Sequence, residues 1–460
     1  MSRQLFGRKQ IFTDKRMIDA SNVCEVLDKV RTDFEKNSSD AKYLWDYYRG
    51  KTPILGKTKE VRENINHMIA ENRAYQIVEF KNATCFGEPV QYISRGRESD
   101  NAVMLEAINE LNAAMAVTGK STVDRHLGLW MHIAGVAYRI ALPSAVGEDV
   151  PFRYYALSPV NTFVVYHSGI EHEPVMACTV VENGTEKTYC CYTDNEYFEI
   201  VGGAIKKREP HALGVVPIIE YPLNDARLGA FEIVLPLLDA INELESNRLD
   251  DVQQSVNSFL ALLGGAMDDE TYSRLEEYKM LCLPEGVDAK YLSVALHQAD
   301  MQVLKDNLYQ SVLTICGMPS QSTEATSSSD TGAATFYRGG WQQVGSRAKD
   351  TADEFKASEM RFIALVLRIL RDTVGTPLRV QDVEVKFSAS FTDAILSKTQ
   401  VLQQLLSAGI DPEIAIATCG IWSDPVGVYI KSKSYLDQWN IGGDDDGVRD
   451  DGQSLETLRA

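Results

Sequence analysis

Apolar residues recur at helical spacing through the first third of the chain. This spacing predicts helices over residues 17–37, 40–49, 58–84, 101–117 and 122–133. Gly87 and Pro89 follow the third of these. Glycine caps a helix and proline forces extended backbone, so a single strand is expected over residues 90–93.

From Gly135 onward the apolar residues alternate with polar ones instead. Alternating runs separated by Pro, Gly, Asn and Asp predict an antiparallel β region of about 85 residues. Its strands are expected over residues 136–142, 152–157, 162–166, 175–181, 187–192 and 197–201. The region ends at the extended segment GVVPIIEY, residues 214–221.

Helical spacing returns after this β region. One apolar stripe runs from Ile233 to Leu263 and predicts a long helix over residues 228–263. A helix of roughly 30 residues spans about 45 Å, which is too long for a small core and indicates packing against neighbouring copies. An insert after Gly264 is expected to hold a helix over 269–278 and strands over 280–283 and 291–294. A second helix over 298–316 then returns alongside the first.

The last third begins with a stretch of small polar residues, 320–335. A very long helix is expected from near Ala334 to about Asp372, with Gly339, Gly340 and Gly345 favouring a kink. A strand over 383–387 and helices over 393–408 and 411–418 follow, before an acidic, glycine-rich end. The elements together predict an α+β fold that is mainly helical.

The bulk composition is typical of a soluble globular protein. The 460 residues are 44% hydrophobic and 24% charged, which allows an extensive core and about three ordinary domains. The longest apolar runs, 259–267 and 362–367, are much shorter than the ~20 residues of a membrane span. Residues 1–16 lack the apolar stretch of a signal peptide. No membrane association is expected.

The net charge of −19 bears on nucleic-acid binding. A protein that grips DNA usually presents a basic face, so this balance argues against tight binding. It leaves open a surface along which DNA slides. The eight cysteines are scattered, with only Cys190 and Cys191 adjacent, which is typical of buried thiols in a reducing cytosol. Their spacing matches no zinc motif.

The nearest approach to a catalytic motif is Ala114-x4-Gly119-Lys120-Ser121, a relaxed P-loop pattern. A P-loop needs a buried strand that feeds a glycine-rich turn. Here a polar-faced helix leads into a turn with one glycine, so a helix–turn–helix junction is favoured over a nucleotide site. Acidic runs such as Asp250-Asp251 are more typical of solvated faces than of metal sites. We therefore expect no enzymatic activity, no metal and no cofactor.

Three segments are distinctive in combination. WDYYRGKTPI, residues 45–54, contains a tyrosine-tyrosine-x-glycine step, and ATCFGEPVQY, residues 83–92, ends a helix with glycine-x-proline-valine. GVVPIIEY, residues 214–221, leads into LLDAINELESNRLDD, residues 237–251. Each motif alone is common. In this order and spacing they resemble the portal proteins of long-tailed bacteriophages, and the resemblance covers roughly residues 40–440.

The resemblance implies a domain organisation. It consists of a wing over 1–222 (helices plus the antiparallel β region), a stem helix over 223–263, a clip over 264–297, a returning stem helix over 298–319, a tunnel loop over 320–335, a second wing part over 336–392 with the long kinked helix and a strand, a helical crown over 393–440 and an acidic, flexible tail over 441–460.

The resemblance also implies two sets of site residues. Hydroxyl-rich side chains of the tunnel loop would touch DNA in the channel, namely Ser322, Thr323, Thr326, Ser327, Ser328, Ser329, Asp330 and Thr331. Partner proteins would dock on the clip, at Asp268, Asp269, Glu270, Tyr272, Arg274, Glu276 and Glu277. Lys305 and Arg338 are further candidates for channel-facing charge, although a surface salt bridge explains either equally well.

The implied function is that of a portal. Twelve copies would form a ring at one capsid vertex, through which double-stranded DNA is packaged and ejected. The implied partners are the terminase large subunit, the major capsid and scaffolding proteins, and the head-completion adaptor. The protein would reside in the virion, and in the host cytoplasm during assembly. Two alternatives stay open: another structural or scaffold protein of the virion, and an ATP-driven motor that rests only on residues 114–121.

Overall fold

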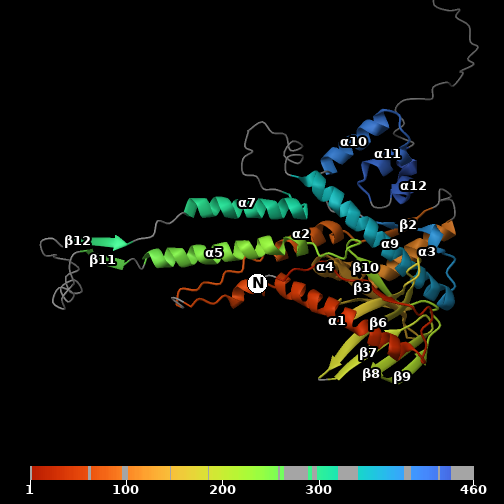
Figure 1. The fold of residues 1–460 in the computed structure, drawn as a ribbon. Helices are drawn as coiled ribbons and strands as arrows, with labels where there is room; N and C mark the ends of the chain where they lie inside the picture. Colours follow the sequence, from red (N-terminus) through yellow and green to blue (C-terminus); the bar gives the residue numbers. More distant parts are fainter. Residues whose placement is uncertain are drawn as a thin grey trace, which may run out of the picture.

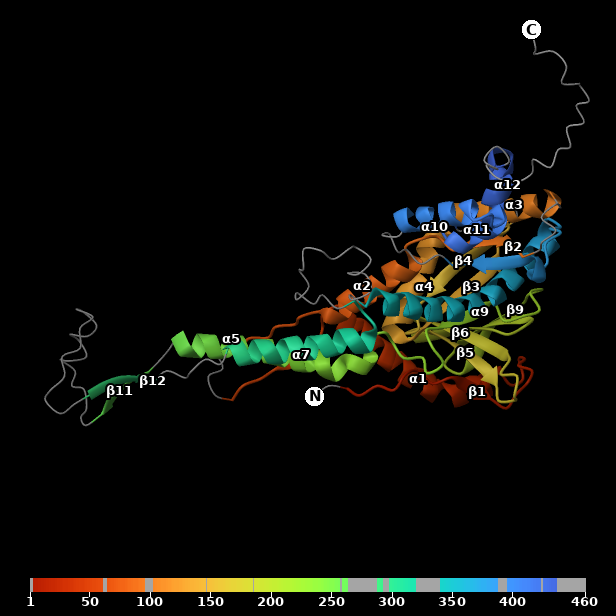
Figure 2. The ribbon, with the colours of Figure 1, turned by 90° about the horizontal axis from the view of Figure 1, so that it is seen from above.

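The computed structural model describes residues 3–60, 64–95, 102–145, 147–184, 186–256, 259–263, 288–292, 298–319, 340–387, 395–422 and 425–436. The chain forms a body of sheets and helices from which a two-helix arm projects (Figures 1 and 2). Among the helices of these residues, none combines the length and apolar character needed to cross a membrane.

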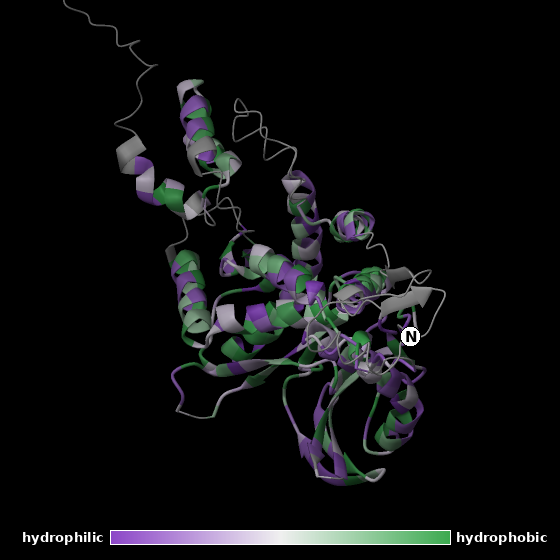
Figure 3. Ribbon diagram, turned by 90° about the vertical axis from the view of Figure 1, so that its left-hand side faces the viewer, coloured by the Kyte–Doolittle hydropathy of each residue, from purple (hydrophilic) through white to green (hydrophobic). Residues whose placement is uncertain are grey.

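A six-stranded sheet forms one side of the body. Its order is β1-β5-β6-β7-β8-β9, and all neighbours are antiparallel except β1 and β5. The strands are β1 (Ile11–Thr13), β5 (Thr162–His167), β6 (Pro174–Asn183), β7 (Glu186–Tyr192), β8 (Glu196–Val201) and β9 (Ala204–Pro210). Buried and more exposed residues alternate along β1, β7 and β8, and the sheet carries both hydrophilic and hydrophobic residues (Figure 3). Because alternate side chains point to opposite faces, one face is apolar and can be covered.

Helix α1 (Val23–Tyr48) covers that apolar face. Val23, Val26, Leu27, Val30 and Phe34 recur at helical spacing and pack on Phe163, Met176 and Phe198 of the sheet. The rings of Phe34 and Phe163 stack with centroids 4.4 Å apart. One apolar stripe on α1 thus meets one apolar face of the sheet.

The largest core surrounds helix α9 (Trp341–Thr373). Its apolar positions contact a three-stranded sheet, α3 (Ala102–Val117) and α4 (Lys120–Ala134). That sheet has the order β10-β3-β4, with β10 (Ile218–Pro222), β3 (Val136–Pro143) and β4 (Phe152–Leu157). The helical spacing in the sequence is confirmed here, since Phe355, Phe362, Val366, Leu367 and Leu370 are all buried.

The remaining elements complete the body. They are η1 (Pro53–Gly56), α2 (Arg73–Phe86), β2 (Gln91–Ser94), η2 (Glu232–Val234), η3 (Val380–Asp382), β13 (Val383–Lys386), α10 (Ile395–Ser407), α11 (Pro412–Cys419) and α12 (Pro425–Leu436). Strands β2 and β13 pair although nearly 300 residues separate them, and so tie the first part of the chain to the last.

Four charged side chains are buried at the centre of this core. Arg139 of β3, which is fully buried, forms ion pairs with Asp124 of α4 and Glu359 of α9. Lys120 pairs with the same two carboxylates. Burial alone would raise the pKa of Glu359, but Arg139 and Lys120 outweigh it and hold that pKa at about 2.

Two tyrosine hydroxyls complete the cluster of these four charges. Tyr92 of β2 and Tyr221 of β10 donate to Glu359, with O–O distances of 2.6 and 2.8 Å. Three elements of the body, α4, α9 and β3, and two further strands therefore converge on one ionised carboxylate. We call these six residues the buried charge cluster.

The helices near the N-terminus differ from the predicted ones. Residues 23–48 form one continuous helix rather than two, because Ser38 and Ser39 do not break it. The helix expected over 58–84 is wrong in its first half, since α2 begins only at Arg73. Ile65 is buried in non-helical backbone whose amides bond to side chains of a later helix. Tertiary hydrogen bonds outweigh the local spacing here.

Further differences concern the later elements. Helix α5 (Leu235–Val256) ends before Phe259–Leu263, which form strand β11 and pair with β12 (Asp288–Leu292). The predicted helix over 228–263 is thus too long. Strands β1 and β9 and helix α12 were not predicted. The predicted strand over 291–294 lies at 288–292, while the helix over 269–278 and the strand over 280–283 lie outside the described residues.

The cysteines also differ from the expectation of buried thiols. Cys178 and Cys191 lie directly opposite each other on β6 and β7 and are joined as a disulfide. The spacing of the cysteines in the sequence does not predict this pair, because the register of the β6–β7 hairpin brings the two residues together. Cys190, the neighbour of Cys191, is a free thiol.

Glu359→Gln tests the buried charge cluster. Losing one partner of a buried ion network costs about 3 kcal/mol, so we expect a clear fall in Tm by calorimetry at pH 7. The folded pKa of about 2 lies below the ordinary 4.5. The stabilisation is therefore full above pH about 4.5 and is lost as the pH falls towards 2, and Glu359→Gln removes this part of the pH dependence.

The control for this prediction is Glu35→Gln, which removes an exposed carboxylate paired with Arg31 on α1. An exposed pair of this kind contributes at most about 1 kcal/mol. Equal Tm values for the two variants at pH 7 would contradict the structural role of the buried charge cluster.

Candidate functional site: the projecting arm

The arm consists of α5 and α7 (Gln298–Cys316), which lie side by side and point away from the body (Figure 2). The β11–β12 pair lies beyond their outer ends (Figures 1 and 2). The predicted helix over 298–316 is confirmed at both ends. It stops where Gly317 adopts a φ of +64°, a left-handed conformation that ends helices.

The base of the arm is apolar and belongs to the body. Leu235, Leu238 and Ile241 of α5 pack with Val312 and Leu313 of α7 in one buried cluster. The same cluster includes residues of α1 and α2 such as Leu44, Tyr47 and Ile77. Tyr47 belongs to the tyrosine-tyrosine-x-glycine segment, and its hydroxyl donates to Asp239 of α5 at 2.8 Å. That segment therefore anchors the arm.

Farther out, polar contacts hold the two helices together. Arg248 of α5 donates to the amide oxygens of Gln298 and Gln302 on α7, at 2.6 and 2.8 Å. Lys305 of α7 lies 3.0 Å from a carboxylate oxygen of Glu245 and 3.2 Å from one of Glu71. The outer half of the arm thus relies on directional bonds rather than on an apolar seam.

An extended segment, residues 64–72, runs along α5 (Figure 1), and its Glu71 also lies 3.2 Å from Lys305 of α7. We call it the strap. Its backbone amides at His67, Ile69 and Glu71 donate to side chains of α5, with distances of 2.8–2.9 Å. The acceptors are Asp250, Ser246 and Asn242, in that order.

The periods of the two chains explain why this ladder fits. Two residues of extended chain advance about 6.7 Å, and four residues of helix advance about 6 Å. Alternate amides of the strap therefore meet side chains four residues apart on α5. Asn242, Ser246 and Asp250 are all buried, which makes unpaired alternatives costly.

Asp250 makes more polar contacts than either of the other two acceptors of the ladder. Lys57 and Lys59 both form ion pairs with its carboxylate, with N–O distances of 2.9 and 2.5 Å. The amide and the ring Nδ1 of His67 each lie 2.8 Å from the other oxygen. Burial tends to raise the pKa of Asp250, but these donors and cations hold it well below its usual value.

The charge of the arm is mainly negative. Helix α5 carries five acidic residues and one basic one, and α7 carries two acidic residues and one basic one. The two basic residues, Arg248 and Lys305, are both committed to the contacts above. In these two helices no cation is left unpaired on the surface. Asp306, Gln310 and Thr314 follow one exposed strip of α7.

Few of the site residues expected from the sequence can be placed. The tunnel-loop and clip candidates, within 320–335 and 264–297, lie outside the described residues, and so does Arg338. Lys305 is explained by its two ion pairs, as the salt-bridge interpretation expected. In the described part of the chain, no group of three or more His, Cys, Asp or Glu side chains is arranged to hold a metal ion.

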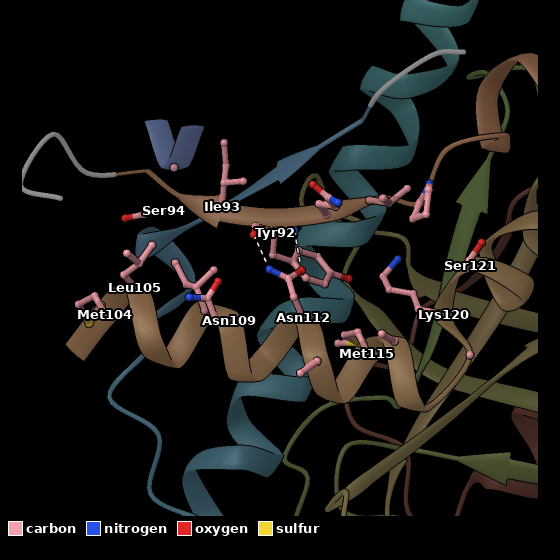
Figure 4. A pocket seen from close by; sticks show the side chains of 18 of the residues that line it. Tyr92, Ile93, Ser94, Met104, Leu105, Asn109, Asn112, Met115, Lys120 and Ser121 are labelled. Carbon is pink, nitrogen blue, oxygen red and sulfur yellow. Dashed lines mark hydrogen bonds between the residues drawn. The ribbon is translucent and has the colours of Figure 1, made fainter. Parts of the chain in front are cut away.

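The P-loop pattern forms a helix–turn–helix junction between α3 and α4, as favoured from the sequence. Lys120 points into the buried charge cluster and is almost fully buried. A cavity of about 740 Å³ lies between α3, β2 and α12 near this turn. In it Asn112 bonds to the backbone of Tyr92 through both its amide atoms, at 2.8 and 3.1 Å (Figure 4).

The ladder on α5 was missed from the sequence, although a signal was present. Asn242, Ser246 and Asp250 recur every fourth residue within a helix predicted from its apolar stripe. A polar stripe of small hydrogen-bonding side chains on such a helix predicts a bonded partner, but nothing local identified residues 64–72 as that partner.

Asp250→Asn tests the ladder, with the adjacent Asp251→Asn as a matched control. The first variant removes the charge that holds Lys57 and Lys59, while the second removes a charge outside the ladder. We expect trypsin to cleave after Lys57 or Lys59 about tenfold faster in Asp250→Asn, equivalent to about 1.4 kcal/mol in local opening. Equal cleavage rates in the two variants would contradict the ladder.

The sequence matches a known protein family. The profile of the family "Phage portal protein, SPP1 Gp6-like" matches residues 27–419. Among solved structures, the chain is similar to one from the "Virion of native gene transfer agent (GTA) particle", with 15% identity, a TM-score of 0.46, and 83% of this chain and 94% of that chain covered.

A second similar structure is the "Neck of empty GTA particle computed with C6 symmetry", with 14% identity, a TM-score of 0.45, and 76% of this chain and 90% of that chain covered. A third is the "Neck of native GTA particle computed with C12 symmetry", with 14% identity, a TM-score of 0.45 and coverages of 76% and 89%. No curated protein matches the chain. Because the family profile spans most of its length, the chain belongs to the phage portal protein family, SPP1 Gp6-like.

Proposed function

We propose that twelve copies of this chain close into a portal ring at one capsid vertex, with the arms surrounding the channel through which DNA enters and leaves. Membership of the portal family supports the ring and the passage of DNA. The observation that carries the role of the arm is its charge: it projects from the body, is acidic, and has both of its basic residues paired.

A channel for DNA must not hold the DNA. Each lysine or arginine that contacts phosphate adds salt-dependent affinity, and twelve copies multiply every such contact. An acidic lining instead repels the duplex from the wall. The exposed strip of Asp306, Gln310 and Thr314 on α7 fits this role, because its side chains offer at most weak polar contacts.

Rigidity of the lining matters as much as its charge. The strap bonds to α5 through the ladder, and its Glu71 also pairs with Lys305 of α7, so both helices of the arm are held within one copy. α7 therefore keeps its position without help from the DNA. Exposed apolar side chains on the arm, Leu249, Val303 and Leu304, are available for the neighbouring copies. In a closed ring such head-to-tail contacts leave no edge unused.

The finer roles rest on the resemblance to portal proteins. Residues 264–297 would form the clip that meets the terminase large subunit and later the head-completion adaptor. Residues 393–440, which include α10, α11 and α12, would form the crown inside the capsid. The wing would contact the major capsid and scaffolding proteins. The protein would act in the virion after assembly in the host cytoplasm.

Asp306→Lys tests the lining, with Asp28→Lys on the exposed side of α1 as a control that changes the charge equally. A lysine in the channel adds up to twelve phosphate contacts per ring, so we expect about tenfold tighter retention of duplex DNA at low salt and slower packaging. The measurement is retention of labelled DNA by purified rings as a function of salt. Equal retention by the two variants would contradict a channel-facing strip.

Replacement of Ser327, Ser328 and Ser329 by glycine tests the tunnel loop. Without hydroxyls the loop loses its transient contacts with phosphates, so we expect a lower rate or yield of packaged DNA in an assembly assay. The control is the same replacement at exposed Ser407, at the end of α10. Unchanged packaging in the triple variant would overturn the role of the loop.

A further inference from the structure

Five exposed arginines, Arg95, Arg361, Arg368, Arg371 and Arg379, gather in one groove near the C-terminal end of α9. A hollow of about 860 Å³ is lined by Arg95, Arg371 and Arg379. It adjoins a second cavity of about 730 Å³, which Arg361 and Arg371 line together with Arg368. Arg371 and Val380 belong to both, so the two form one continuous groove. We call it the arginine groove.

In the part of the chain that the structure describes, most guanidinium groups of this groove have no acidic partner; the exception is Arg16 of the second cavity, which lies 4.0 Å from Glu171. Among the described residues, Arg95, Arg361, Arg371 and Arg379 form no ion pair, and Arg368 donates only to the carbonyl of Leu213. Several arginines elsewhere in the body are paired, as in Arg3–Asp40, Arg31–Glu35, Arg208–Glu196 and Arg227–Glu220. In a chain of net charge −19, a concentration of unpaired cations is unusual and favours an anionic ligand.

The charge within the groove is uneven. Of the described residues that line the hollow around Arg95, Arg371 and Arg379, none is acidic. The lining of the second cavity includes four acidic residues, namely Glu171, Glu173, Asp194 and Glu220. An anionic segment would therefore bind mainly at the first hollow and along the adjacent turns of α9.

We propose that the acidic C-terminal segment of this chain, residues 437–460, binds in the arginine groove. Its acidic residues are Asp437, Asp444, Asp445, Asp446, Asp450, Asp451 and Glu456. Carboxylates match the planar fork of a guanidinium and pair with it in two parallel hydrogen bonds. The segment is part of the same polypeptide, so its concentration near the groove is high without any further partner.

The place where the segment starts supports this occupant. It follows α12, whose Gly427 and Ile430 line one cavity together with β2. Arg95 comes directly after β2. The eight residue steps from Leu436 to Asp444 span roughly 26 Å when extended, which gives the aspartates a long reach from the end of α12. Duplex DNA is the weaker candidate, because the overall negative charge of the chain opposes its approach.

The test measures the reactivity of individual arginines in the assembled full-length protein. Phenylglyoxal modifies accessible guanidinium groups, and mass spectrometry gives the rate at Arg371, at Arg379 and at Arg125, an exposed arginine of α4. The test variant is Asp444→Asn/Asp445→Asn/Asp446→Asn. The control Asp28→Asn/Asp33→Asn/Glu35→Gln removes the same charge from α1.

We expect Arg371 and Arg379 to react about fivefold faster in the test variant and in 1 M salt than in the native protein at low salt, since both conditions remove charge pairing. Arg125 and the control variant should show no such change. Unchanged rates at Arg371 and Arg379 in the test variant would overturn the proposal. If a short DNA duplex slowed those rates while the test variant left them unchanged, the groove would be a nucleic-acid site instead.

Discussion

The arrangement of the arm depends on one set of hydrogen bonds, between backbone amides of the strap and polar side chains of α5. In the part of the chain that the structure describes, the apolar cluster at the base of the arm includes Leu235, Leu238 and Ile241 but no residue from the outer half of α5, so burial of hydrocarbon there contributes little to its position. Asn242, Ser246 and Asp250 supply directional contacts instead, and Lys57 and Lys59 add charge to the last of them. The helix is thereby fixed in register as well as in direction.

Charge is used in different ways in different parts of the molecule. The buried charge cluster around Glu359 pairs every ionised group and joins α4, α9 and β3 inside the body. On α5 and α7 the two cations, Arg248 and Lys305, are likewise bonded to groups of the same chain, which leaves an acidic surface on these helices. A portal must let DNA pass, and a surface that offers no free cation to phosphate meets that requirement.

Local patterns in the sequence predicted those elements whose structure is decided locally. The helix over 298–316 and the buried face of α9 follow directly from apolar spacing and from Gly317. The order of three weak motifs indicated the family, and the family profile confirms it over residues 27–419. The helix predicted over residues 58–84 is wrong up to residue 72. Ile65, Met68 and Ile69 have helical spacing by coincidence, and hydrogen bonds to side chains about 180 residues away determine their backbone conformation.

The candidate site was predicted less completely than the fold. No local pattern in the sequence predicts the buried charge cluster. Only strand pairing and helix packing bring together its charged residues, which are Lys120, Asp124, Arg139 and Glu359. The helix–turn–helix junction before Lys120 was predicted correctly, because a helix rather than a strand precedes its turn. The tunnel-loop and clip residues remain proposals that rest on the resemblance.

Electron microscopy of the purified full-length protein, with native mass spectrometry to count subunits, tests the central claim most directly. The account predicts closed rings of about a dozen copies, with the arms arranged around a central hole and α7 facing it. A stable monomer across protein concentration and salt, or open and irregular assemblies, would contradict it. So would closed rings in which the arms point away from the hole.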